Sequence, residues 1–291
     1  MLGKLMKYEW RATRRTFLPL YIAMVLIAII NGIFFKFDEP TFYDTLEHGT
    51  VMGGLLENIV GIVQTFAIIL YVGVIIGTVL LTLFVVGQRY YKNILGTEGY
   101  LMHTLPVKSW ELILSKGVMS AIWIVCSGFV AFLSIIIMIF ILEPEDMVEA
   151  FQIIFQTKTW EIINEYVGVG NLIGYGIELL LEVLCASWLF CMKAYAAMSL
   201  GHLVQKHRLL GSVGFYIGID LAENVIMGTL VAIFGSIFLS PIQQFFSTMT
   251  TEEMIRTFHG IFLVSIIFCL VLGSIYFIVS KILLEKKLNL E

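Results

Sequence analysis

Charged residues are scarce in this sequence. They make up 14 % of its 291 residues, whereas apolar residues make up 59 %, and the mean hydropathy is +0.92. A soluble domain of this length needs more polar sequence than this to cover its surface. The composition therefore excludes a soluble globular protein and indicates a polytopic membrane protein.

Motifs for nucleotide and metal chemistry are also missing. The sequence contains no G-x-x-x-x-G-K-[ST] phosphate loop, so the chain has no recognisable means of using ATP by itself. It contains no H-E-x-x-H motif, and its five histidines are scattered between both predicted sides of the membrane. We therefore expect no catalytic residue, no metal site and no cofactor on this chain.

What the sequence does contain is six long apolar runs. Each reaches the roughly 20 residues that a bilayer-crossing helix needs. The predicted transmembrane helices are 17–35, 59–86, 118–142, 171–200, 209–239 and 261–280. All four cysteines lie inside these helices, which favours a packing role over disulfide bonds. Because no soluble domain or low-complexity linker interrupts the runs, we expect one all-α membrane domain over residues 1–291.

The basic residues alternate along the chain. Most of the 18 Lys and Arg residues lie before the first run, between the second and third, between the fourth and fifth, and after the sixth. The intervening connections are acidic. Basic connections remain in the cytoplasm, so the pattern predicts that both termini are cytoplasmic.

Residues 1–16 are expected to form an interfacial helix ahead of the first span. On a helix, the apolar residues form one stripe: Leu2, Leu5, Met6, Trp10 and Phe17. The basic residues lie on the opposite side: Lys4, Lys7, Arg11, Arg14 and Arg15. Glu9 is the exception, because it falls at the edge of the apolar stripe. This helix is either a topological anchor or a lever that links a moving domain to the first span.

Residues 88–116 form the longest basic connection, between the second and third spans. Gly96 is placed to end the second span, Thr97 to cap a short helix, and Pro106 to break it. The short helix carries large apolar residues that face water: Tyr100, Leu101, Met102 and Leu105. Such residues indicate a docking surface, with a plain helical connector as the alternative.

The segments predicted to lie outside the cell are also helical. Within 143–170, the residues from Met147 to Phe155 place apolar side chains on one face, which predicts an amphipathic helix on the outer leaflet or over a cavity. Thr250 and Glu253 have the spacing of a capping box. They predict a short outer helix over 251–258 that leads into the last span.

Four carboxylates lie inside predicted spans. Glu178 and Glu182 are one helical turn apart, and so are Asp220 and Glu223, with Asn224 beside them. A carboxylate in the bilayer costs several kcal/mol unless it is protonated, paired or hydrated. The group is either a cavity for a cationic or amphipathic substrate, a proton-linked gate, or a polar clamp between helices. Lys193 lies roughly 16 Å along the helix from Glu182, so we expect it to snorkel rather than pair within its helix.

Two segments resemble bacterial ABC-2-type transporter permeases. They are LGKLMKYEWRATRRTFLPLY at the start of the chain and GTEGYLMHTLPVKSWELILSK between the second and third spans. The resemblance implies a six-helix half-transporter that pairs with a second permease. It also implies an N-terminal elbow helix and a cytoplasmic coupling helix, on which a separate ATP-binding subunit docks. The implied elbow residues are Lys7, Glu9, Trp10, Arg11 and Arg14. The implied coupling residues are Glu98, Gly99, Tyr100, Leu101, Met102, His103, Leu105 and Pro106.

The resemblance further implies export of an amphipathic or cationic peptide, drug or lipid-like substrate across a bacterial plasma membrane. ATP and Mg would then be bound by the partner subunit, and membrane lipid rather than nucleic acid would surround the chain. Two functions of other classes stay open. One is an ion-coupled secondary transporter or channel that uses the intramembrane carboxylates. The other is a membrane sensor or scaffold that does not transport.

Overall fold

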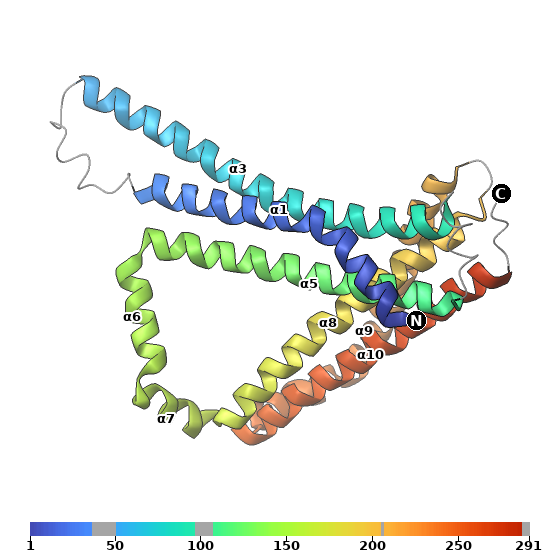
Figure 1. Cartoon of the computed structure of the whole chain (residues 1–291). Helices are drawn as coiled ribbons and strands as arrows, with labels where there is room; N and C mark the ends of the chain where they lie inside the picture. Colours follow the sequence, from blue (N-terminus) through green and yellow to red (C-terminus); the bar gives the residue numbers. More distant parts are fainter. Residues whose placement is uncertain (37–50, 97–106, 205–206, 287–291) are drawn as a thin grey trace. The chain divides into compact units, whose positions relative to one another are not determined.

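The computed structural model describes residues 1–36, 51–96, 107–204 and 207–286. These residues form eight α-helices and one short π-helix and contain no strand, which confirms the predicted all-helical class (Figure 1). In chain order the elements are α1 (Leu2–Lys36), α3 (Val51–Tyr90), η1 (Tyr91–Leu95), α5 (Ser109–Leu142), α6 (Pro144–Phe155), α7 (Thr157–Tyr166), α8 (Val169–Gly201), α9 (Arg208–Thr248) and α10 (Thr251–Lys286).

Six of these helices are long and apolar enough to cross a membrane, namely α1, α3, α5, α8, α9 and α10. The prediction of six spans in a multi-pass membrane protein is confirmed at this level, while the side of the membrane that each end faces stays a prediction. The helices extend beyond the predicted spans, because hydropathy marks only the apolar stretch and not the polar turns that continue it.

Two predicted boundaries are corrected. The predicted elbow helix at 1–16 and the first span at 17–35 belong to one uninterrupted helix, α1, with Pro19 inside it. The predicted short helix at 251–258 is the first part of α10. The capping box itself is confirmed, since the backbone N–H of Thr250 donates to Glu253 Oε2 at 2.9 Å and the backbone N–H of Glu253 donates to Thr250 Oγ1 at 3.4 Å.

The segment between α5 and α8, which is predicted to lie outside the cell, contains two short helices. Pro144 occupies the first turn of α6, where its missing N–H costs nothing. No side chain of α6 or α7 is buried, which fits the predicted amphipathic surface helix. Gly168 separates α7 from α8 with φ +82°, a left-handed conformation that favours glycine.

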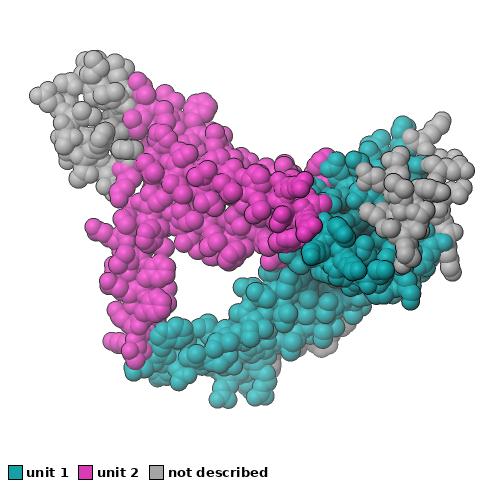
Figure 2. Space-filling view, viewed as in Figure 1, with its two compact units in different colours: residues 1–9, 85–122, 160–291 teal, residues 10–84, 123–159 magenta. Residues whose placement is uncertain are grey.

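The chain divides into two compact units (Figure 2). Unit 1 contains residues 1–9, 85–122 and 160–291, and unit 2 contains residues 10–84 and 123–159.

In unit 2, aromatic rings of α1 pack on α5. The Trp123 ring stacks on both Trp10 and Phe17, with 4.6 Å between ring centroids in each pair. The Trp123 indole N–H also donates to Thr13 Oγ1 at 2.7 Å, and the Tyr21 hydroxyl donates to the Trp123 carbonyl at 3.3 Å. These four α1 residues lie on both sides of Pro19. Their shared contact with α5 explains why the helix continues through a residue that removes one backbone hydrogen bond.

In unit 1, two fully buried tyrosines form the centre of the packing. The rings of Tyr90 and Tyr195 stack at 4.0 Å. The Tyr90 hydroxyl lies 2.8 Å from Ser199 Oγ, and the Tyr195 hydroxyl lies 2.9 Å from Ser120 Oγ. Hydroxyls inside a membrane protein need such partners because no bulk water reaches them. The predicted helix end at Gly96 is confirmed, since η1 ends at Leu95 and Gly96 follows directly.

Candidate functional site: charged clusters of unit 1

The first charged cluster joins three segments around Glu9, and we call it the Glu9 cluster. The Glu9 carboxylate accepts a hydrogen bond from Lys116 Nζ through Oε1 and lies 3.1 Å from the Arg89 guanidinium through Oε2. Glu9 is 9 % exposed and Lys116 is 3 % exposed. A lysine buried to this extent needs a carboxylate beside it, because an isolated buried ammonium is very costly.

The position of the Glu9 cluster explains the exception in the N-terminal sequence. Glu9 leaves the basic face because it turns into the protein, whereas Lys7, Arg11 and Arg14 are exposed. Arg89 is in the last turn of α3 and Lys116 is in the second turn of α5. The cluster therefore ties the start of the chain to helices on both sides of the segment 97–106. The predicted coupling residues Glu98 to Pro106 lie outside the described residues.

Trp10, the remaining predicted elbow residue, belongs to unit 2. Its ring is 40 % exposed and covers one face of Trp123. The apolar stripe of the N-terminal helix thus contacts protein at this residue, where the sequence alone predicted a membrane surface.

The second charged cluster lies within predicted spans and is centred on Lys193 of α8, so we call it the Lys193 cluster. Lys193 Nζ donates to Asp220 Oδ1 and to Glu223 Oε2 of α9, both at 2.8 Å. Asn224 Nδ2 donates to Asp220 Oδ2 at 3.2 Å, and the Tyr276 hydroxyl of α10 donates to Glu223 Oε1. One ammonium is therefore shared by two carboxylates from the neighbouring helix.

Burial differs among the charged groups of the Lys193 cluster. The side chains of Lys193 and Glu223 are 12 % and 24 % exposed, whereas that of Asp220 is 46 % exposed. Lys193 also lies 5.4 Å from the centroid of the Tyr216 ring, a distance suited to a cation–π contact. The ammonium of α8 is consequently held by three side chains of α9, while the Asp220 carboxylate keeps access to the surroundings of the chain.

The two carboxylates of α8 contact α10 separately. His259 Nδ1 lies 2.8 Å from both carboxylate oxygens of Glu178. Tyr175 stacks on the His259 ring at 4.3 Å. Glu182 Oε1 lies 2.7 Å from Ser265 Oγ.

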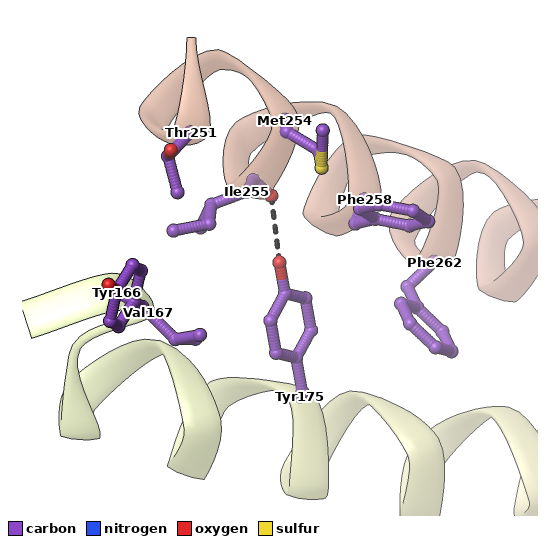
Figure 3. A pocket seen from close by; sticks show the side chains of 8 residues that line it. All are labelled: Tyr166, Val167, Tyr175, Thr251, Met254, Ile255, Phe258 and Phe262. Atoms are coloured by element: carbon purple, nitrogen blue, oxygen red, sulfur yellow. Dashed lines mark hydrogen bonds between the residues drawn. The ribbon is translucent and has the colours of Figure 1, made fainter. Parts of the chain in front are cut away.

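A pocket of about 380 Å³ lies beside the His259 ring, between the start of α8 and the start of α10 (Figure 3). Its lining is almost entirely apolar and aromatic: Tyr166, Val167, Tyr175, Thr251, Met254, Ile255, Phe258 and Phe262. Figure 3 shows Tyr175 reaching from α8 toward α10, where its hydroxyl donates to the Ile255 carbonyl at 3.1 Å. Such walls suit the apolar part of a ligand.

The structure thus sorts the five predicted polar residues into two sets. Asp220, Glu223 and Asn224 share the Lys193 cluster, whereas Glu178 and Glu182 each have a partner on α10. Sequence reasoning missed the partners His259, Ser265 and Tyr276. It also predicted that Lys193 snorkels, because only its own helix was considered.

Metal coordination finds no support in the part of the chain that the structure describes. Among these residues, no three His, Cys, Asp or Glu side chains are grouped so as to hold a metal ion.

Comparisons with protein-family models, with curated proteins and with solved structures find no match to this chain. Six apolar helices with buried charged clusters define the chain as a multi-pass helical membrane protein.

Proposed function

We propose that this chain is the membrane-spanning permease subunit of an ATP-driven ABC-2-type exporter. Three observations support the proposal. Six helices are able to cross the membrane, two segments resemble this family, and the sequence lacks a phosphate loop of its own. The Glu9 cluster is the strongest structural support for the proposal, because it links the predicted elbow to both sides of the predicted coupling segment.

In the proposed mechanism, a separate subunit binds ATP and Mg and docks on the coupling segment around Leu101 and Leu105. Closure of that subunit on ATP moves the coupling segment and, with it, Arg89 and Lys116. Both cations hold the Glu9 carboxylate, so the movement reaches α1 through charged contacts. A charge-assisted contact suits this role because it is strong and has a fixed geometry.

The proposed cargo is an amphipathic or cationic molecule, exported across the plasma membrane of a bacterium. The half-exposed Asp220 carboxylate supplies negative charge for a cation, and the aromatic pocket supplies an apolar wall. A second permease, either the same chain or a related one, would complete the transporter.

Co-purification tests the proposal. The tagged chain is isolated in mild detergent from its native host, and we expect an ATP-binding subunit to remain bound in stoichiometric amount. Leu101→Asp and Leu105→Asp should release it, because each places a charge in the proposed apolar docking surface. Ile162→Asp is the matched control, since Ile162 is an exposed apolar residue of α7. A folded wild-type chain that purifies without such a subunit contradicts the proposal.

An ion-coupled secondary transporter is a second candidate, and the Lys193 cluster favours it. Ionisable groups inside membrane spans mark ion and proton pathways in many transporters. The discriminating experiment uses the purified chain alone in vesicles. Movement of ions along an imposed gradient, without any ATP-binding subunit, would favour this candidate over the exporter.

A further inference from the structure

Glu182 differs from the other carboxylates of unit 1. It lies in the middle of α8, in a helix long and apolar enough to cross the membrane. Its Oε1 atom lies 2.7 Å from Ser265 Oγ and 3.9 Å from Cys269 Sγ, both on α10. Its Oε2 atom is buried and has no hydrogen-bond partner among the described residues.

The other three carboxylates each contact a basic side chain. Glu178 contacts His259, while Asp220 and Glu223 contact Lys193. Among the described residues, the groups that contact the Glu182 carboxylate are a hydroxyl and a thiol, which are neutral. An ionised carboxylate with one bare oxygen in such a place would cost several kcal/mol, and protonation removes most of that cost.

We propose that Glu182 is a proton-binding site, held as a neutral carboxylic acid within the membrane. Ser265 Oγ donates to an ionised Oε1; once Oε1 binds the proton, the direction of this hydrogen bond reverses, and Oε2 is left as a carbonyl oxygen. This arrangement fits the geometry, because a buried carbonyl oxygen without a partner costs less than a buried charge or an unpaired donor. The ligand of the site is therefore a proton.

The groups around Glu182 do not offer a competing cation. On α8, Glu178 lies one turn away and is engaged with His259, and Cys185 lies three residues further along the helix. On α10, Cys269 approaches Oε1 itself. Lys193 lies roughly 16 Å further along α8 by the rise of the helix and is bound to two carboxylates of α9. Exchange of the proton with water then requires the contact between α8 and α10 to open.

Reaction with a hydrophobic carbodiimide tests the proposal on the wild-type chain in lipid nanodiscs. The O–H of a protonated carboxyl adds across a C=N bond of the reagent, and acyl transfer to nitrogen leaves a stable N-acylurea with no leaving group. Peptide mass spectrometry then locates the adduct. At neutral pH we expect about tenfold more adduct at Glu182 than at Glu178 or Glu223, and less adduct as the pH is raised. Equal or lower labelling at Glu182 in a reagent-accessible chain overturns the proposal.

If the carbodiimide does not reach Glu182, infrared spectroscopy tests whether this carboxyl is protonated. The wild-type chain should show the C=O band of a protonated carboxyl at neutral pH, and Glu182→Gln should lose it. Glu145→Gln, at an exposed residue of α6, should leave the band unchanged. A spectrum without that band, or a band that persists in Glu182→Gln, overturns the proposal.

Discussion

The two units of the molecule bury different kinds of polar group. The polar contacts described for unit 2 are between neutral groups, such as Tyr71 with Ser134 at 2.8 Å and Thr82 with Ser127 at 3.0 Å. The ion pairs described above all lie in unit 1, in the Glu9 cluster, the Lys193 cluster and the pair of Glu178 with His259. The contacts described for unit 2 thus join neutral groups, whereas unit 1 also contains charged ones.

We interpret the neutral contacts of unit 2 as serving helix packing and the charged contacts of unit 1 as serving function. Neutral hydroxyl contacts between membrane helices contribute modestly and specify which faces meet. Buried charges are costly to desolvate and are often less stabilising than apolar residues of the same volume, so their presence is not explained by stability alone. Unit 1 is therefore where we expect substitutions to change activity, and unit 2 is where we expect them to change stability mildly.

Of the variants considered, Lys193→Met is expected to lower the free energy of unfolding most. The substitution leaves Asp220 and Glu223 without their shared ammonium, and the cost falls mainly on Glu223, the more buried of the two carboxylates. Thermal unfolding in detergent measures this loss. Lys158→Met, at an exposed lysine of α7, is the control and should have no effect.

A compensating variant sharpens the same prediction. Adding Asp220→Asn and Glu223→Gln to Lys193→Met removes the stranded charges and should restore most of the lost stability. A triple variant as unstable as Lys193→Met would show that packing, rather than charge, holds these helices together.

Glu9→Gln should cause the next largest loss of stability. Gln keeps one oxygen as an acceptor, but Arg89 and Lys116 lose the negative charge between them. We expect a loss of about 2 kcal/mol in the free energy of unfolding. Glu145→Gln is the control, since Glu145 is exposed in the first turn of α6. Equal stability of the two variants would contradict a buried ionic role for Glu9.

Tyr71→Phe tests how much a neutral hydrogen bond of unit 2 contributes to stability. It removes one hydroxyl contact to Ser134 inside unit 2 and should cost about 0.6 kcal/mol, the average for such contacts between membrane helices. Unfolding measurements compare it with Tyr8→Phe, where the hydroxyl belongs to an exposed residue. A loss as large as that of Glu9→Gln would remove the distinction between the units.

The smallest change in stability is expected from the protonation of His202, which lies just after α8. Burial, followed by the nearby Arg208 guanidinium, lowers the pKa of His202 below its ordinary value of 6.5. The unfolded chain then binds the proton more readily, so stability is lost as the pH falls below about 6.5 through the folded pKa. His202→Gln should unfold with a weaker dependence on pH in this range. An unchanged dependence would show that His202 is not responsible.

The fold was largely predictable because apolar runs of this length have one common outcome. Hydropathy located all six spanning helices, and local rules located the capping box at Thr250 and Glu253 and the helix end at Gly96. Helix boundaries were less predictable. Pro19 lies inside α1 because aromatic contacts with α5 hold the helix on both sides of it, and such tertiary contacts leave no local signal.

The candidate site was predictable only as a set of residues. Spacing of one turn identified Glu178, Glu182, Asp220 and Glu223, but their partners lie 27 to 83 residues away in sequence and follow from helix packing. Glu9 was the informative exception. Its place at the edge of an apolar stripe was visible in the sequence, although nothing there indicated that it is buried or that Arg89 and Lys116 are its partners.

ATP hydrolysis by the purified complex tests the central claim most directly. We predict that the ATP-binding subunit hydrolyses ATP at one rate with the wild-type chain or Glu145→Gln, and at a severalfold different rate with Glu9→Gln, while all three complexes keep the subunit bound. This result would show that the Glu9 cluster transmits between the two subunits. Equal rates with Glu9→Gln and Glu145→Gln, or a wild-type chain that binds no ATP-binding subunit, would contradict the account.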